Sequence, residues 1–498
     1  MTEFENYIDG HARPAAAGAV FETYNPSRID ERLGRFPDST VVDVDAAVVA
    51  ATRAFAAWRA TPAPARGEIL LEAGRLMAER KRELAAMVSR ENGKTVAAAL
   101  GDVQSGIDMA RFAAGEGRRW YGRTTHSALP QRFAMTQRIP VGVVGVITSW
   151  NFPWAITCWK VLPALLCGNP VVLKSEEHCP ESALRFAEIL TQAGLPAGVL
   201  NVVHGRGPAA GVALTHHPGV AMIAFTGSSA VGRQVAQACA ARLAKVSLEL
   251  GGKNAVIVLE DADLDLAADA VVTGAFSLSG QRCTATSRVI VQQSVWPAFL
   301  ERLITRSARL RVGPGWDDAS EVTPLISRNQ LERVLGYLAR ARATGARVCI
   351  GGERLKGGVY DQGYYVAPTI LDQVDPASEI AREEVFGPVL AALPAASFAD
   401  ALRLHNAVPY GLSAALFTRS IDRAFQFFDA AEAGVLYINA PTFGSEPHLP
   451  FGGVKASGLG YREAGWAAIE AFSEVQGLYL DYSARVQNVQ FATDSKEA

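Results

Sequence analysis

The spacing of apolar residues changes near residue 120. Between residues 43 and 120, apolar side chains recur every three or four positions, as in DVDAAVVAATRAFAAWRA and RGEILLEAGRLMAERKRELAAMVSREN. This period predicts amphipathic helices that bury one face. Asp43 and Asp45 lie at the start of the first helix, so we expect them to supply its N-cap oxygens.

Beyond residue 140 the apolar residues gather in short runs. Five runs are rich in β-branched residues and apolar nearly throughout: 141–147, 170–174, 199–205, 221–227 and 254–260. Strands without polar alternation are buried on both faces, as in parallel sheets. Helical stretches such as AITCWKVLPALLCG separate the runs. The alternation predicts an α/β fold whose first unit is a doubly wound, Rossmann-type sheet.

The rest of the chain again alternates predicted strands and helices. A second α/β alternation runs from about 262 to 450, and the tail EVQGLYLDYSARVQ returns to β character. That tail is expected to pair with another segment or with another chain. A chain of 498 residues is too long for a single hydrophobic core, so two or three domains are expected.

Composition excludes several classes of partner. The 48 Lys and Arg residues face 50 Asp and Glu, so there is no basic excess for nucleic acid or an anionic membrane. Apolar runs such as VGVVGVI are far shorter than the roughly 20 residues of a membrane helix. The start, MTEFENYIDG, lacks the regions of a signal peptide. We therefore expect a cytoplasmic protein with no nucleic-acid or membrane partner.

The six cysteines form neither a disulfide framework nor a CxxC pair, so we expect a reducing compartment and no metal site. Cys283 differs from the rest in its setting. It lies in LSGQRCTATSR, among small and polar residues and directly after Arg282. This stretch alone leaves open whether Cys283 is a nucleophile or a structural thiol.

Two glycine-rich turns follow predicted strands. In FTGSSAVG the strand ends at Phe225 and a helix begins around residues 229–231. Gly227 and Gly232 would let the backbone approach a phosphate at that helix N-terminus. Neither this turn nor GRGPAAG has the GxGxxG spacing, and GRGPAAG is interpreted as a plain turn.

Polar residues in apolar surroundings allow two interpretations each. Glu249 in LELGGKNAVIV is a general base of raised pKa or a salt-bridged glutamate. Asn151 in SWNFPW is an oxyanion donor or a helix cap. Lys174, followed by two glutamates, suits a ribose-bearing ligand or a solvated charge cluster. Two further loops combine Gly, Pro, aromatic and charged residues: REEVFGPV and HLPFGGVKASGLGYRE. Each is either a plain surface turn or a loop that folds over a ligand.

Together these stretches closely resemble the NAD(P)-dependent aldehyde dehydrogenase superfamily. WNFP, FTGS, ELGGK, GQRC, EEVFGPV and PFGGVKASG occur in the order of that family, over nearly the whole chain. Any single motif proves little, whereas a chance match of all six is negligible. The resemblance implies an NAD-binding domain over 1–121 and 142–251 and a catalytic domain over 252–450. It also implies an oligomerisation element over 122–141 and 474–498, which forms homodimers or homotetramers.

The resemblance also implies roles for single residues. Cys283 matches the nucleophile that forms a thiohemiacetal, loses hydride to the nicotinamide and becomes a thioester. Glu249 matches the general base, and Asn151 with the backbone N–H of Cys283 matches the oxyanion hole. Lys160 and Glu463 match polar residues implicated in proton relay. The cofactor-binding positions are Trp150, Lys174, Glu177, Gly227, Ser228, Gly232, Leu250, Glu384 and Phe386, and the aldehyde tunnel is lined by Phe152, Trp159 and Phe451.

The cofactor is expected to be NAD, with NADP as the alternative. A carboxylate at Glu177 that accepts from both ribose hydroxyls would repel a 2′-phosphate. The chain departs from the family here, because Ser175 stands where proline is usual. Glu176 could then take the place of Glu177 after a shift of register.

The substrate is indicated by Arg282. If its side chain points into the tunnel, it would pair bidentately with the far carboxylate of a semialdehyde, such as 2-oxoglutarate or 2-aminoadipate semialdehyde. Its alternative role is a structural backbone contact. An aromatic or aliphatic aldehyde is the alternative substrate, because the aromatic residues Trp154, Trp159 and Phe443 would suit it. His448 and Glu446 are expected either at the tunnel mouth or on the surface.

Three other classes of protein compete with this interpretation. A branch of the family that passes the acyl group to coenzyme A typically lacks the glutamate of ELGGK, and Glu249 is present here. A thiol hydrolase needs a histidine beside Cys283, and none of the eight histidines lies in such a motif. A non-catalytic binding protein would not need to retain both Cys283 and Glu249.

Overall fold

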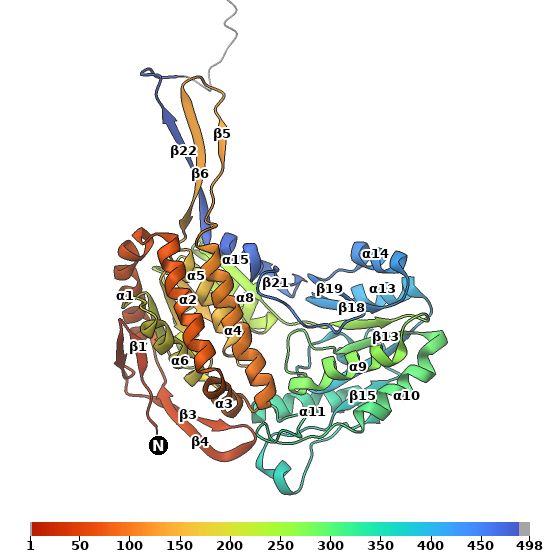
Figure 1. Cartoon of the computed structure of the whole chain (residues 1–498). Helices are drawn as coiled ribbons and strands as arrows, with labels where there is room; N and C mark the ends of the chain where they lie inside the picture. The colour runs from red at the N-terminus through yellow and green to blue at the C-terminus, as the bar shows by residue number, and fades with distance from the viewer. Residues whose placement is uncertain (1, 488–498) are drawn as a thin grey trace, which may run out of the picture.

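Two mainly parallel sheets and a projecting arm form the molecule, as Figure 1 shows. The computed structural model describes residues 2–487. Residues 488–498 of the predicted oligomerisation element lie outside this range.

The first sheet has eight strands. In spatial order they are β2 (His11–Arg13), β1 (Asn6–Ile8), β9 (Leu200–Val203), β8 (Val171–Lys174), β7 (Val144–Ile147), β10 (Met222–Thr226), β11 (Lys245–Glu249) and β21 (Gly458–Gly460). The five strands from β9 to β11 are parallel, while β1, β2 and β21 pair antiparallel. The chain thus returns from the second sheet to complete the first.

Helices cover both faces of this sheet, as expected for a parallel sheet. One face packs against α2 (Ala63–Glu79), α3 (Lys81–Asn92), α4 (Val96–Glu116), α5 (Ala155–Leu166), α6 (Pro180–Gln192) and α15 (Gly465–Ala471). The other packs against α1 (Val41–Ala60), α7 (Val212–His216) and α8 (Ser229–Ala241). Alternate strand residues supply the two cores: Val171 and Leu173 face one layer, and Val172 faces the other.

The second sheet has seven strands. Their order is β14 (Arg347–Ile350), β15 (Thr369–Asp372), β16 (Val389–Ala395), β13 (Arg288–Gln292), β12 (Ala255–Val258), β18 (Ser413–Phe417) and β19 (Val435–Ile438), with only β14 antiparallel. Three groups of helices pack on it: α9 (Leu264–Phe276) with α10 (Trp296–Ser307), α13 (Phe398–Asn406) with α14 (Ile421–Ala430), and α11 (Arg328–Ala343) with α12 (Glu379–Arg382).

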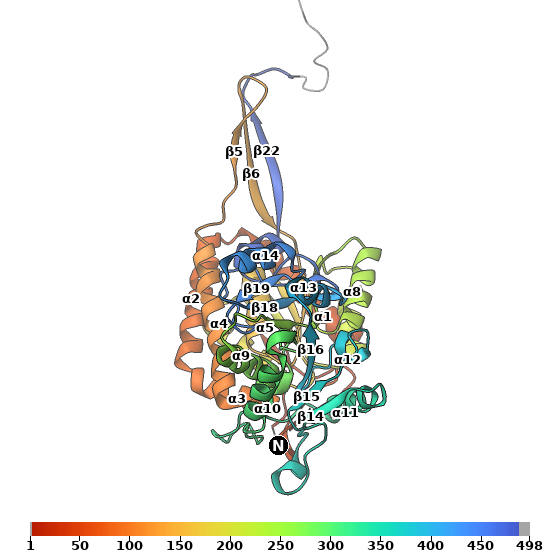
Figure 2. The same cartoon turned by 90° about the vertical axis from the view of Figure 1, so that its right-hand side faces the viewer.

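The arm is a three-stranded antiparallel sheet of β5 (Thr124–His126), β6 (Arg132–Pro140) and β22 (Ser473–Asp481). It rises away from the body in both views (Figures 1 and 2). The remaining elements are two antiparallel strand pairs and four short helical turns. The strand pairs are β3 (Val20–Asn25) with β4 (Arg28–Pro37) and β17 (Tyr410–Gly411) with β20 (Val454–Lys455). The turns lie at Gly207–Gly211, Ser277–Gly280, Gln293–Val295 and Gly358–Gln362.

The apolar pattern predicted most of these elements. All five β-branched runs form strands, and the α/β class is confirmed. The predicted cap of α1 is wrong: Thr40 is the N-cap, and Asp43 lies inside the helix, where it accepts from the Thr40 N–H at 2.9 Å. Strand β11, which carries Glu249, was not predicted. In residues 2–487, no helix combines the length and apolarity that spanning a membrane requires.

Two glycines of α4 give opposite stability predictions. A Cβ on Gly106 would lie 2.7 Å from the Sγ of Cys158 and from the ring of Trp154, whereas a Cβ on Gly101 meets nothing within 4 Å. Gly106→Ala is expected to lower stability by about 1–3 kcal/mol through overpacking. Gly101→Ala is expected to raise it by about 0.5–1 kcal/mol, because alanine restricts the unfolded chain. Thermal melting followed by circular dichroism compares the two, and equal melting temperatures would contradict this packing.

Candidate active site

Two adjoining cavities lie beyond the carboxyl ends of the first-sheet strands. β7, β10 and β11 end at Ile147, Thr226 and Glu249, and ligands of open α/β sheets bind at such edges. The Glu384 cavity, of about 140 Å³, is lined by Ser149, Trp150, Asn151, Thr226, Gly227, Ser228, Leu250, Gly251, Cys283, Gln330, Arg333, Glu384 and Phe386. The Arg282 cavity, of about 250 Å³, is lined by residues that include Phe152, Trp159, Glu249, Arg282, Cys283, Phe443, Phe451 and Glu463. Thr226, Leu250 and Cys283 border both cavities.

The loop that carries Cys283 is held in an unusual conformation. Leu278, Ser279 and Gly280 all have positive φ, between 53° and 67°. Gly280 must be glycine, because a Cβ there would lie 2.1 Å from the carbonyl oxygen of Gly387. Oε1 of Gln281 accepts from the N–H of Ile326 at 2.9 Å, and this bond anchors the loop to the segment that leads into α11.

The ELGGK motif fits closely around this loop. The amide of Asn254 donates to the carbonyl oxygen of Cys283 at 2.7 Å. A Cβ on Gly252 would lie 2.6 Å from that same oxygen, and one on Gly251 would lie 2.3 Å from Oε2 of Glu384. The two glycines therefore allow the Cys283 loop and Glu384 to approach the end of β11.

Burial keeps the Cys283 thiol protonated. It raises the pKa of Cys283 to about 12, with the carboxylates of Glu384 and Glu249 adding to the shift and Arg282 opposing it. A thiol of this pKa is a weak nucleophile at neutral pH. Attack by Cys283 therefore requires a base in the cavity.

Glu249 is available as that base. Its side chain is buried at the end of β11, and neither carboxylate oxygen has a hydrogen-bond partner within residues 2–487. Burial raises the pKa of Glu249 to about 8, against the attraction of Lys160 and Arg462. The structure thus does not show the alternative of a salt-bridged loop glutamate. Gly452 leaves room for the carboxylate, because a Cβ there would lie 2.4 Å from Oε1.

Asn151 lies in the loop between β7 and α5. Its Oδ1 accepts from the Ser149 hydroxyl at 2.8 Å, which leaves the amide N–H groups for other acceptors. The alternative role as a helix cap is wrong: the N-cap of α5 is Trp154, and the first N–H of that helix, on Ala155, donates to Asp102 at 2.7 Å. Trp154 itself is buried against Phe186 rather than lining a cavity.

Arg282 lies in the apolar cavity with unused donors. Its guanidinium carbon is 4.0 Å from the centre of the Phe443 ring and 5.5 Å from that of Phe152. Nε and Nη1 are buried and have no hydrogen-bond partner in the part of the chain that the structure describes, so the structure does not show the alternative of a backbone contact. Burial lowers the pKa of Arg282 to about 10, and the side chain remains a cation at neutral pH.

The other predicted tunnel residues lie on the same cavity. Trp159 and Phe451 meet edge to face at 5.8 Å, and the Trp159 N–H donates to Ser105 at 2.9 Å. Lys160 and Glu463 form a buried ion pair. Burial lowers the pKa of Lys160 to about 7, opposed by Glu249. By contrast, Glu446 and His448 form an exposed pair at 3.5 Å and do not line the cavity.

The Glu384 cavity gathers its residues from both sheets. Glu384 accepts from the Gly252 N–H at 3.0 Å, and burial raises the pKa of Glu384 to about 7. Phe386, in a left-handed conformation, meets Trp150 edge to face at 5.2 Å. Two residues of α11 that sequence reasoning missed hold this loop: Gln330 donates to the carbonyl of Phe386 at 2.7 Å and Arg333 to that of Glu384 at 2.8 Å.

Lys174, Glu177 and Gly232 line neither cavity. Lys174 is buried, which lowers its pKa against the attraction of Glu176 and Glu177, so it is not part of a solvated cluster. Glu176 accepts from the backbone N–H of His178 at 2.6 Å and lies 2.9 Å from its ring. Glu177 instead accepts from the Gly207 N–H at 3.2 Å.

The turn after β10 matches the sequence interpretation closely. The strand ends at Thr226, and α8 begins at Ser229 with Ser228 as its N-cap. A Cβ on Gly232 would lie 2.5 Å from Leu250, so this glycine brings α8 close to the loop after β11.

The structure also explains why serine stands at position 175, where the family usually has proline. The N–H of Ser175 donates to the carbonyl oxygen of Val203 at 3.1 Å, which proline could not do. The Ser175 hydroxyl lies 2.7 Å from Nδ1 of His204.

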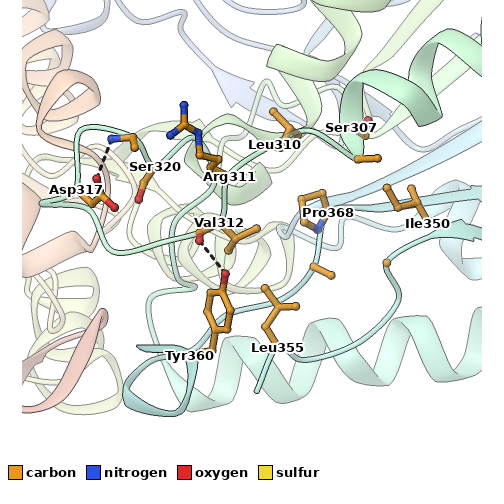
Figure 3. Close-up of a pocket in the computed structure, with 14 residues that line it drawn as sticks. Ser307, Leu310, Arg311, Val312, Asp317, Ser320, Ile350, Leu355, Tyr360 and Pro368 are labelled. Carbon is orange, nitrogen blue, oxygen red and sulfur yellow. Dashed lines mark hydrogen bonds between the residues drawn. The ribbon is translucent and has the colours of Figure 1, made fainter. Parts of the chain in front are cut away.

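A larger cavity of about 490 Å³ lies elsewhere, between the end of α10 and the loops at 310–320 and 350–368 (Figure 3). None of the predicted site residues lines it. Most of the predicted site residues therefore line the two cavities around Cys283. These cavities bring together a thiol, a buried carboxylate, a side-chain amide and a cation.

Known proteins share this fold over nearly the whole chain. A model of the aldehyde dehydrogenase family matches residues 13–478. The alpha-ketoglutaric semialdehyde dehydrogenase of Bacillus subtilis (strain 168) is 42% identical over 475 residues, which are 95% of this chain and 97% of that protein. The structure of an NAD-dependent aldehyde dehydrogenase from Sinorhizobium meliloti has a TM-score of 0.94 at 36% identity and covers 98% of this chain and 96% of its own. An NADP-dependent enzyme from E. coli has a TM-score of 0.93 at 36% identity and covers 96% of this chain and 98% of its own.

Alkylation of Cys283 by iodoacetamide tests the pairing of thiol and base. We expect its rate to rise with pH through about 8, where Glu249 ionises and can take the thiol proton. In Glu249→Gln the rise should move to higher pH, toward the pKa of the thiol itself. A Cys283→Ala variant subtracts the reaction of the other five cysteines, four of which are buried. Identical pH profiles for the wild type and Glu249→Gln would contradict the role of Glu249.

Proposed function

The chain belongs to the aldehyde dehydrogenase family, and we propose that it oxidises a semialdehyde bearing a carboxylate, with NAD as the hydride acceptor. The single observation that carries the substrate proposal is the state of Arg282. A buried cation with two unpartnered N–H donors lies in the same cavity as the nucleophile. Unsatisfied buried donors are unfavourable until a ligand supplies acceptors.

A carboxylate is the acceptor that best matches a guanidinium. It would take two parallel N–H bonds and neutralise the buried charge. The rings of Phe443 and Phe152 lie beside the guanidinium, and a cation–π contact of this kind favours one placement of the charge. The Bacillus subtilis relative is named for 2-oxoglutarate semialdehyde, a substrate of this class. The aromatic walls also support a second candidate, a neutral aromatic or aliphatic aldehyde.

Residues that line the Glu384 cavity, together with Lys174, Glu177 and Gly232 outside it, suit a dinucleotide. The first-turn N–H groups of α8 suit a pyrophosphate beside Gly227, Ser228 and Gly232. Glu384 would accept from the nicotinamide ribose, with Trp150, Leu250 and Phe386 against the ring. Lys174 and Glu177 would hold the adenosine ribose, while Glu176 is already engaged by His178. NAD, when bound, accepts the hydride. Glu177 favours NAD over NADP, because its charge would repel a 2′-phosphate.

The proposed reaction begins with proton transfer from Cys283 to Glu249. The sulfur then attacks the aldehyde carbon, and the resulting oxyanion accepts from the amide of Asn151 and the N–H of Cys283. Loss of hydride from this thiohemiacetal leaves a thioester on Cys283. Lys160 and Glu463, as a buried ion pair near Glu249, would pass the proton away from the base.

Hydrolysis of the thioester completes the turnover. Glu249 removes a proton from water, which adds to the thioester carbonyl, and the acid leaves as the thiol reforms. The buried, unpartnered carboxylate of Glu249 supports water as the acyl acceptor over coenzyme A.

We also propose roles for the larger parts of the chain. Residues 1–121 and 142–251 would bind NAD, and 252–450 would carry the catalytic loop. Segments 122–141 and 474–487 would join subunits into a homodimer or homotetramer, which sedimentation velocity measures. Several large side chains on the arm are exposed, which supports this role: Phe133, Met135, Val475, Tyr479 and Leu480. The six free cysteines support a cytoplasmic location.

Turnover with a small aldehyde panel tests the function. We expect reduction of NAD with 2-oxoglutarate semialdehyde, no requirement for coenzyme A, and slower reduction of NADP. Cys283→Ala should remove all turnover, because no thioester can form. No reduction with any aldehyde would overturn the proposal, and a dependence on coenzyme A would assign the chain to the acylating branch.

Arg282 variants test the substrate class. Replacement by methionine keeps the apolar length but removes the charged donors, so kcat/KM for the semialdehyde should fall about 100-fold. Propanal, which has no carboxylate, serves as the matched control substrate and should change by only about 3-fold. Equal losses for both substrates would show that Arg282 supports the loop rather than the carboxylate, and a neutral aldehyde would then be favoured.

A further inference from the structure

The segment Glu91–Lys94 ends α3 beside the proposed oxyanion residue. Gly93 takes a left-handed conformation with φ of 84° and closes the helix through its N–H to Ser89. The Ser89 hydroxyl donates to the carbonyl of Lys94 at 2.7 Å. This turn directs the next side chain, that of Lys94, into the interior, where it is 1% exposed.

The ammonium of Lys94 has three neighbours. It donates to Asp102 at 3.0 Å and to the main-chain carbonyl of Asn151 at 2.7 Å. It also lies 4.4 Å from the centre of the Phe152 ring. Asp102 balances its charge, and the second oxygen of Asp102 accepts from the N–H of Ala155 at 2.7 Å. The Lys94–Asp102 pair therefore contacts the 151–155 loop at two points.

Asn92 holds the preceding peptide of the same loop. Its amide donates to the main-chain carbonyl of Trp150 at 2.8 Å. Peptide units are planar, so a fixed carbonyl fixes the whole unit. Asn92 and Lys94 together hold the two peptide planes that flank Asn151. The direction in which the Asn151 side chain leaves the backbone is thereby set from outside the loop.

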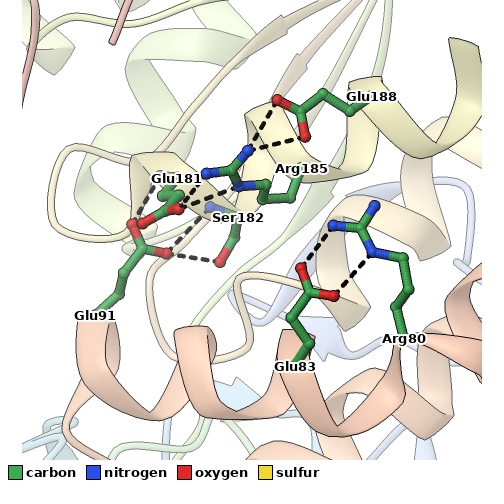
Figure 4. A network of polar contacts seen from close by, with 7 residues as sticks. All are labelled: Arg80, Glu83, Glu91, Glu181, Ser182, Arg185 and Glu188. Atoms are coloured by element: carbon green, nitrogen blue, oxygen red, sulfur yellow. Dashed lines mark hydrogen bonds and ion pairs between the residues drawn. The ribbon is translucent and has the colours of Figure 1, made fainter. Parts of the chain in front are cut away.

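The helix end that provides these contacts is itself anchored. Glu91 accepts from the N–H of Glu181 at 2.7 Å and from the hydroxyl of Ser182 at 2.7 Å, in the first turn of α6 (Figure 4). α6 follows the loop with Lys174 and Glu177. The turn at 91–94 thus lies between the proposed oxyanion loop and the proposed ribose loop.

We propose that Lys94 and Asn92 are positioning residues for the oxyanion amide of Asn151. This inference rests on the proposed function, because it requires Asn151 to donate to the oxyanion. Among the described residues, Ser149 makes the other side-chain hydrogen bond to Asn151, and this bond orients the amide without holding either flanking peptide. An oxyanion donor acts only where its position is held before the reaction.

Lys94→Met tests the inference, because methionine keeps the length of the side chain and removes the ammonium. We expect kcat to fall about 100-fold, as for a donor misplaced by roughly 1 Å. The dissociation constant of NAD and the alkylation rate of Cys283 should change by less than about 3-fold, because neither depends on the oxyanion amide. Lys81→Met is the matched control: Lys81 also links α3 to α4, through Gln104, but does not contact the 151–155 loop.

A double-mutant cycle with Asn151→Ala separates positioning from general structure. If Lys94 acts through Asn151, adding Lys94→Met to Asn151→Ala should lower kcat by less than about 3-fold. Multiplicative losses, or a Lys94→Met enzyme with unchanged kcat, would overturn the inference. Unchanged kcat in Asn151→Ala alone would instead remove Asn151 from the proposed function.

A companion variant guards against misfolding. Lys94→Met leaves Asp102 buried without its cation, which is destabilising. The pair Lys94→Met with Asp102→Asn removes both charges and keeps an oxygen for the N–H of Ala155. It should melt near the wild type and show the same loss of kcat, and full activity in a folded double variant would overturn the inference.

Discussion

A buried carboxylate without hydrogen bonds imposes the strongest constraint on this molecule. Glu249 occupies the last position of β11, and its oxygens face a cavity instead of a donor. Burial alone would favour the protonated acid, and only Lys160 and Arg462 oppose that effect. Gly452 has to be glycine to leave room for it. The same low-dielectric surroundings raise the pKa of Cys283, so this thiol stays protonated at neutral pH unless a base takes its proton.

Both sheets contribute residues to the two cavities around Cys283. The first sheet presents Glu249, Asn151 and the turn before α8 at the carboxyl ends of its strands. The second sheet presents Cys283 and Glu384 from loops, which α11 and Asn254 fix by hydrogen bonds to main-chain carbonyls. Side-chain contacts to backbone recur on the other side of the cavity, where Asn92 and Lys94 hold the carbonyls beside Asn151. Phe152 connects the two functions, because both Lys94 and Arg282 lie against its ring.

The sequence predicted the parts of the site that are local. GQRC, ELGGK and WNFP each place one chemical group in a short, recognisable stretch, and most of these residues line the two cavities. Gln330, Arg333 and Lys94 could not be found that way, since each acts on a backbone carbonyl more than 50 positions away. The only sequence signal for Lys94 is a lysine directly after a helix-ending glycine, and such residues are usually on the surface. The error at Asp43 has a similar cause: the capping box joins Thr40 and Asp43, and the pattern alone did not show which of them begins the helix.

Hydrophobic period and motif order predicted the α/β class and the buried strands and singled out Cys283 as the candidate nucleophile, because those properties depend on neighbours along the chain. Three properties were decided only in the folded chain. They are the pKa of Cys283, the lack of hydrogen-bond partners for Glu249 and for Nε and Nη1 of Arg282 among the described residues, and the different hydrogen-bond partners of Glu176 and Glu177. Each of these depends on which groups are excluded from water and which donors lie within about 3 Å. Arg282 shows the difference most clearly. Its position beside Cys283 is visible in the sequence. That its buried Nε and Nη1 have no hydrogen-bond partner among the described residues, and that Phe152 and Phe443 lie beside it instead, is seen only in the folded chain.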